Sequence, residues 1–154
     1  MKTSLLLSGS ALMLVVVGIQ FVRPTENLGT TGGPNDITVR FGVPDDVHQI
    51  LVDACYDCHS NRTRYPWYAN VQPVAWWLNH HVQHGKRELN FSEFGGYTEK
   101  RAAHKLDAIV KEVGGGDMPL NSYTWAHPAA RLTPGQRKTL VDWAQAQHDK
   151  IAPH

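Results

Sequence analysis

The chain of 154 residues contains two cysteines, which lie three positions apart and are followed directly by a histidine, in Cys55-Tyr56-Asp57-Cys58-His59. Residues three apart in a helical turn lie on the same face of that turn. Two thiols placed in this way reach the two vinyl groups of one haem, and the next imidazole reaches the iron as an axial ligand. The spacing therefore predicts one covalently attached c-type haem on Cys55, Cys58 and His59.

Three other uses of the two cysteines fit the sequence less well. A disulfide across so short a loop would add little stability, because stabilisation grows with the length of the closed loop. A thioredoxin-like dithiol is expected beside a βαβ unit, and strand patterns are scarce here. A zinc site needs two further ligands, and although histidines are available, no second cysteine pair is present.

A haem iron has a second axial position, which methionine or histidine often fills in electron-transfer proteins. Outside the apolar N-terminus the chain has one methionine, Met118, which follows Gly114-Gly115-Gly116 and precedes Pro119. We therefore expect Met118 to be the second iron ligand. Histidines are the rival candidates, ranked as His81 or His84 first and then His127.

Aromatic and basic residues follow the predicted iron ligand directly. Arg62 is suited to pair with a haem propionate, and Trp67 and Tyr68 are suited to donate hydrogen bonds to one. Solvent-facing arginines and ordinary core packing are the alternatives for these residues. We expect Arg62, Trp67 and Tyr68 to be further haem-binding residues.

The N-terminus reads as a targeting segment. Residues 3–22 carry no charged residue and are mostly apolar. Their length predicts a transmembrane helix within residues 1–23, and a cleaved signal peptide is the competing interpretation. Residues 24–40, rich in Gly, Pro and Thr, are predicted to be a flexible linker, which leaves 41–154 as the haem-binding domain. This interpretation places the chain in the inner membrane as a single-pass protein, with the domain on the periplasmic side.

Helical signals dominate the predicted domain. A helix is expected from about Pro44 into the cysteine motif, and further helices are expected at 73–85 and 98–113. A fourth begins after Thr133, where Pro134 and Gln136 complete a capping box. The predicted fold is a small all-α, cytochrome c-like domain around one haem, preceded by a transmembrane helix.

The net charge of +1 gives no reason to expect a nucleic-acid partner, which would require a basic patch. The expected partners are instead the membrane, through the N-terminal helix, and a periplasmic or membrane redox protein.

Residues 55–143 resemble the bacterial haem-binding domain family, which is related to class I cytochrome c. The pieces that carry the resemblance are Cys55-Tyr56-Asp57-Cys58-His59-Ser60-Asn61, Tyr65-Pro66-Trp67-Tyr68, Pro73, Gly85, Leu89-Asn90-Phe91-Ser92, Met118-Pro119-Leu120 with Tyr123 and His127, and Leu132-Thr133 through Trp143. The resemblance implies a c-type haem with His59 and Met118 as ligands, and it implies no substrate.

These observations favour a membrane-anchored mono-haem cytochrome that transfers electrons in the periplasm and is not an enzyme. Two protein ligands leave no iron position open to a substrate. The alternative is a haem peroxidase or a gas sensor with a labile sixth ligand, in which a histidine acts on the distal side. A third interpretation is a structural or haem-delivery module of a larger complex.

Overall fold

The computed structural model describes residues 2–152, which form an all-helical fold and contain no β-strand. One isolated antiparallel bridge joins Leu28 to Arg62. The helices are α1 (Lys2–Ile19), α2 (Ile37–Phe41), α3 (Asp45–Ala54), α4 (Tyr56–His59), α5 (Val74–Glu88), α6 (Glu99–Gly115), α7 (Asn121–Ala126) and α8 (Pro134–Ile151), with 3-10 turns η1 (Trp67–Asn70), η2 (Phe91–Gly96) and η3 (Pro128–Ala130).

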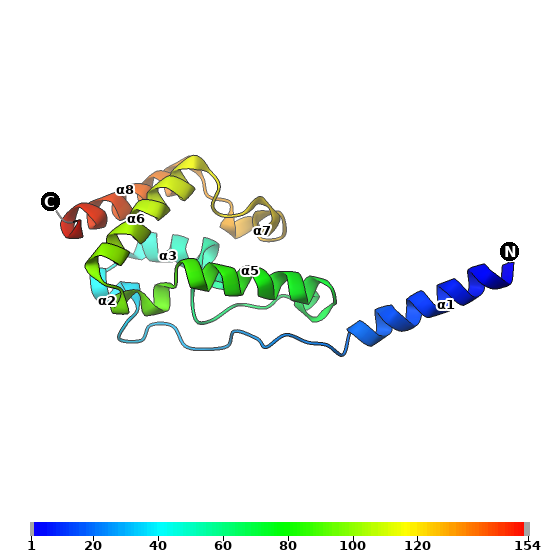
Figure 1. The fold of residues 1–154 in the computed structure, drawn as a ribbon. Coiled ribbons are helices and arrows are strands. Elements are labelled where there is room, and N and C mark those ends of the chain that lie inside the picture. Colours follow the sequence, from blue (N-terminus) through cyan, green and yellow to red (C-terminus); the bar gives the residue numbers. More distant parts are fainter. Residues whose placement is uncertain (1, 153–154) are drawn as a thin grey trace.

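The transmembrane helix predicted at the N-terminus is wrong, and so is the single-pass inner-membrane localisation that depended on it. Among residues 2–152, no helix combines the length and the apolar character that crossing a bilayer requires. Helix α1 has 18 residues, fewer than the ~20 apolar residues that a span needs. Its sequence is also interrupted by the run Ser8-Gly9-Ser10 and by Gly18. In Figure 1 this helix, drawn in dark blue, points away from the rest of the chain.

The predicted helix starts are observed where a capping residue marks them. The Thr133 side chain accepts from the Gln136 backbone N–H, and the Gln136 side chain accepts from the Thr133 backbone N–H. This is the capping box expected at the start of α8. Thr98 caps α6 in the same way by accepting from Arg101. Helix α6 continues to Gly115 and ends at Gly116, whose φ of 89° suits glycine.

The long helices enclose one hydrophobic core. Helices α6 and α8 pack against each other (Figure 1), and α3 packs on α8. Their buried side chains meet the aromatic rings of η2, and together they form a cluster that includes Ile50, Leu51, Phe91, Phe94, Leu106, Ile109, Val113, Leu140 and Trp143. The cysteine motif begins where α3 ends, so one wall of this core carries the candidate site.

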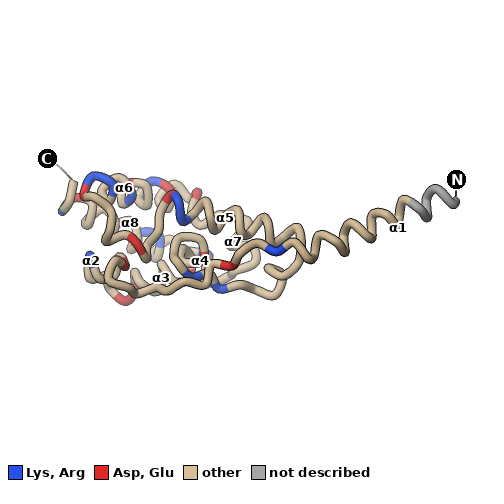
Figure 2. The backbone as a smooth tube through the Cα atoms, turned by 60° about the horizontal axis from the view of Figure 1, so that its bottom comes forward, with Lys and Arg blue, Asp and Glu red and all other residues tan. Residues whose placement is uncertain are grey.

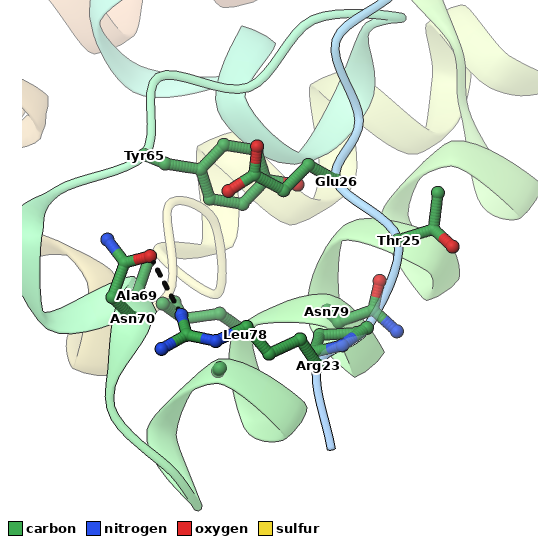
Figure 3. A pocket seen from close by; sticks show the side chains of 10 residues that line it. Arg23, Thr25, Glu26, Tyr65, Ala69, Asn70, Leu78 and Asn79 are labelled. Carbon is green, nitrogen blue, oxygen red and sulfur yellow. Dashed lines mark hydrogen bonds between the residues drawn. The ribbon is translucent and has the colours of Figure 1, made fainter. Parts of the chain in front are cut away.

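The end of the predicted N-terminal segment and part of the predicted linker pack against the domain. Arg23, the last residue of that segment, donates from Nη1 to Asn70 Oδ1 at 3.0 Å, beside a pocket of about 30 Å³ that Tyr65 also lines (Figure 3). Asn27 is buried and donates from Nδ2 to the Ser60 carbonyl and to Thr63 Oγ1, both at 3.0 Å. These contacts hold the segment on the turn that follows His59, and the flexibility of the linker stays a prediction.

The charged residues of the chain lie mainly in the helical domain, since residues 3–22 carry none. Figure 2 shows Lys and Arg interspersed with Asp and Glu over α6 and its surroundings. Several of these charges pair within one helix, such as Lys111 with Asp107 at 2.7 Å and Lys138 with Asp142.

Candidate functional site

The cysteine motif forms a helical turn directly after α3. The Cys58 and His59 backbone N–H groups both donate to the Cys55 carbonyl, at 3.2 and 2.9 Å. Cys55 and Cys58 are not joined by a disulfide. Both line one cavity together with His59, so the turn presents two thiols and an imidazole to the same space.

The His59 ring is fixed in one orientation. Its Nδ1 lies 3.0 Å from the Leu89 carbonyl, and because a carbonyl only accepts, Nδ1 carries the proton. Burial lowers the pKa of the imidazole, which favours the neutral form. Nε2 is therefore left with an available lone pair, as a metal ligand requires.

Helix α5 packs closely against the motif at Gly85. A Cβ atom at this position would lie 2.6 Å from the Cys58 carbonyl oxygen and 3.1 Å from Cys58 Cβ. No larger residue fits here without a shift, so Gly85 sets how closely α5 approaches the turn.

Three cavities adjoin at the motif. The inner cavity, of about 360 Å³, is lined by Cys55, His59 and Met118 together with apolar residues of α3, α6 and α8: Leu51, Ile109, Val113 and Leu140 among them. The motif cavity, of about 120 Å³, is lined by both cysteines, His59, Met118 and Tyr123. The aromatic cavity, of about 520 Å³, lies beside Cys58 and is lined by Trp77, Trp125, Tyr68, His81 and His127 among others.

Met118, the predicted second iron ligand, lies at the same cavities as His59. It lines both the inner and the motif cavity, as His59 does. Its backbone N–H donates to the Glu112 carbonyl at 3.0 Å, which holds this residue at the end of α6. The structure therefore brings the imidazole and the thioether to the same space, and iron ligation by Met118 stays a prediction.

The rival histidines differ in placement. His84 lines both the inner and the motif cavity, and His81 lines the motif and the aromatic cavity. His81 donates from Nδ1 to the Trp77 carbonyl at 2.9 Å. His127 lines the aromatic cavity and lies 3.3 Å from the Tyr68 hydroxyl through Nε2.

The other predicted haem contacts are scattered. Tyr68 lines the aromatic cavity. Arg62 is exposed and pairs through its backbone with Leu28, and Trp67 is 79% exposed. Neither Arg62 nor Trp67 lines the three cavities at the motif. The haem contacts of all three residues stay predictions.

The environment of the thiols is apolar. Burial raises the pKa of Cys55 to about 12 and that of Cys58 to about 11, and the nearby Cys58 adds to the first shift and Asp57 to the second. The thiols are therefore protonated at neutral pH. Among residues 2–152, no group of three or more His, Cys, Asp or Glu is arranged to hold a metal ion, as a zinc site would need.

Sequence reasoning missed Asp57, which lies inside the motif between the two cysteines. Its buried carboxylate accepts from the Arg64 backbone N–H and from Arg64 Nε, both at 3.0 Å, and from the Tyr123 hydroxyl at 2.6 Å. The signal was present, because an acidic residue between two cysteines that line an apolar cavity must be paired. The sequence does not say with which residues.

The all-helical fold and the apolar cavity beside a thiol pair and a free imidazole nitrogen define a cofactor-binding helical domain. The sequence profile of the haem-binding domain family matches residues 14–146, and the chain belongs to that family. In the comparisons with curated proteins and with solved structures, nothing matches this chain.

The residues at the cavities fit a haem. The inner cavity is mostly apolar and lies in the size range of ligand pockets, as a porphyrin ring requires. The two thiols and His59 lie on one turn at the wall of the adjoining motif cavity, and the thioether side chain of Met118, a residue type that can bind haem iron, belongs to the same lining.

Proposed function

We propose that this chain is a mono-haem c-type cytochrome that transfers electrons. Cys55 and Cys58 hold the haem through thioethers, and His59 and Met118 are its axial ligands. When bound, the haem supplies one-electron redox chemistry at its iron. The protein holds the ligands, keeps the ring in an apolar cavity and limits access of water.

The observation that carries the proposal is the shared lining of the motif cavity by Cys55, Cys58, His59 and Met118. All the side chains that a c-type haem needs for attachment and six-coordination meet at one site. A thioether ligand favours reduced iron and raises the reduction potential. With both axial positions filled by protein, the site favours electron transfer over substrate binding.

A cytochrome of this kind exchanges electrons with a redox partner protein. The aromatic cavity lies next to Cys58, so the edge of the attached haem nearest this cysteine would be the edge closest to Trp77 and Trp125. These two indoles are 44% and 82% exposed. We propose this side of the domain as the route by which electrons enter or leave.

The test compares wild type with Met118→Ala after maturation with a haem-attachment system. We expect a six-coordinate low-spin absorption spectrum in wild type and a high-spin spectrum in the variant. His84→Ala is the matched control, because His84 lines the same two cavities, and its spectrum should equal that of wild type.

Two outcomes would redirect the proposal. A low-spin spectrum retained in Met118→Ala and lost in His84→Ala or His81→Ala would move the second ligand to a histidine. Rapid binding of CO by the ferrous wild-type protein, with peroxidase turnover that is lost in a His81, His84 or His127 variant, would favour the peroxidase or sensor alternative.

A further inference from the structure

Helix α7 is short and begins three residues after Met118, yet it is not held in place by fully buried side chains. It spans Asn121–Ala126, and none of its residues is buried. Trp125, its largest side chain, is 82% exposed. A segment with so little apolar contact has low local stability unless polar contacts hold it.

One polar contact ties α7 to the cysteine motif. The Tyr123 hydroxyl donates to Asp57 Oδ2 at 2.6 Å across 66 positions of sequence. Within residues 2–152, the remaining hydrogen bonds of α7 stay inside residues 120–131, where the Tyr123 and Thr124 N–H groups both donate to the Leu120 carbonyl. Tyr123 is therefore the direct hydrogen-bonded link between the Met118 side of the site and the motif.

The acceptor of this hydrogen bond is itself held firmly. Arg64 donates to Asp57 Oδ1 from its backbone N–H and from Nε, and its Nη2 lies 3.2 Å from Oδ2. The Asp57 side chain is 7% exposed. Hydrogen bonds to an ionised, buried acceptor are stronger than those between neutral groups.

The donor is held in place as well. The Tyr123 ring stacks on His127 at 4.1 Å between centroids, and His127 donates from Nδ1 to the Tyr123 carbonyl. Partial desolvation of the half-buried phenol, followed by the hydrogen bond to Asp57, raises the pKa of Tyr123, so the hydroxyl keeps its proton at neutral pH.

We propose that the Tyr123 hydroxyl is a positioning group for the Met118 loop, residues 116–120 between α6 and α7. By donating to Asp57 inside the motif, it keeps this loop in place, so that the thioether of Met118 stays on the iron. The inference rests on the proposed function, because it presupposes a haem ligated by His59 and Met118. The end of α6 fixes one side of the loop through the contact of Met118 with Glu112. Tyr123 fixes the other side.

The experiment uses the matured haem protein and the variant Tyr123→Phe, which removes only the hydroxyl. The readouts are the charge-transfer absorption of sulfur-ligated ferric haem and the rate at which cyanide displaces the sixth ligand. We expect the ferric Tyr123→Phe protein to bind cyanide about tenfold faster or more, because a hydrogen bond to a charged group is lost. Its charge-transfer absorption should weaken, while the spectrum of the low-spin ferrous protein is retained.

Tyr65→Phe is the matched control. The Tyr65 hydroxyl accepts from the Asn27 backbone N–H at 2.8 Å and does not contact the motif cavity. We expect its cyanide rate to equal that of wild type. An equal rise in both variants would overturn the proposal, because general loosening would then explain the effect, and so would an unchanged rate in Tyr123→Phe.

Asp57→Asn, which keeps the shape of the carboxyl group, tests the acceptor of the Tyr123–Asp57 hydrogen bond. It also serves as the test if Tyr123→Phe matures poorly. It should raise the cyanide rate, and the double variant should be no faster than the faster single variant, since both act on the same Tyr123–Asp57 hydrogen bond. Independent, multiplying effects would contradict the link. A wild-type protein without the charge-transfer absorption would sink the proposed ligation itself, whereas its presence in wild type and unchanged in the variants would sink only the role of Tyr123.

Discussion

His59 donates from Nδ1 to the Leu89 carbonyl at 3.0 Å, across 30 positions of sequence. The contact joins the motif to the segment that follows α5, and the Phe91 ring lies edge-on to the imidazole at 6.3 Å between centroids. An orienting hydrogen bond on one ring nitrogen leaves the other nitrogen aimed and unprotonated. The fold thus holds the His59 imidazole in an orientation that leaves Nε2 available to a metal ion.

Replacement of His59 by Ala should remove the proximal ligand while the thioethers keep the haem in place. We expect a high-spin spectrum that returns to low-spin when free imidazole is added, because the vacated space accepts a small ring. Absorption spectra of the purified haem protein check this. An unchanged low-spin spectrum without imidazole would show that another residue binds the iron.

A methyl group at Gly85 should destabilise the domain. The Cβ atom would meet the Cys58 carbonyl at 2.6 Å, which forces α5 away from the motif. We expect Gly85→Ala to lower the free energy of unfolding by about 1–3 kcal/mol, measured by denaturant titration. Gly96→Ala is the control, because nothing lies within 4 Å of a Cβ atom there, and equal stability of the two variants would contradict the steric argument.

The contacts of Asn27 should stabilise the turn after His59. Besides its two Nδ2 hydrogen bonds, Asn27 accepts from Lys86 Nζ at 2.6 Å through Oδ1. We expect Asn27→Ala to cost about 1–3 kcal/mol of unfolding free energy, since buried partners are left unsatisfied. The exposed Asn70→Ala should change stability by about 0.5 kcal/mol or less, and a similar small effect in Asn27→Ala would contradict this role.

The thiols of the haem-free folded chain should react slowly. Burial raises the pKa of Cys58 from 9.0 to about 11, so at neutral pH the thiolate fraction falls about a hundredfold relative to the unfolded chain. Alkylation of the native chain at pH 7 should be slower than in concentrated urea by about this factor. Equal rates would show that the thiols are not buried.

The same shift has a stability consequence of defined sign. A thiol whose pKa is higher in the folded chain than in the unfolded chain stabilises the fold by a constant amount below about pH 9. This contribution is lost as pH rises through about 11. The haem-free chain should therefore lose stability above pH 9, and Cys58→Ser should lose less over that range.

The sequence predicted the parts of the molecule that depend on local rules. The Thr133 capping box and the end of α6 at Gly116 follow from residues close together in the chain. The prediction of a membrane span was wrong because the apolar run, although uncharged, is short and is interrupted by serine and glycine residues.

The contacts that shape the site join residues far apart, and hydrophobic periodicity carries no information about them. Tyr123 reaches Asp57 across 66 positions, and Asn27 reaches Ser60 across 33. Helix α7 has no buried residue, so it shows no apolar stripe by which to predict it. The sequence shows which residue types form the motif, but only the folded structure shows which distant residues contact them.

Mass spectrometry of the chain after maturation with a haem-attachment system tests covalent haem binding most directly. We predict the mass of the polypeptide plus one haem, retained under denaturing conditions, with neither Cys55 nor Cys58 open to alkylation. A polypeptide of unmodified mass with two reactive thiols would contradict the account.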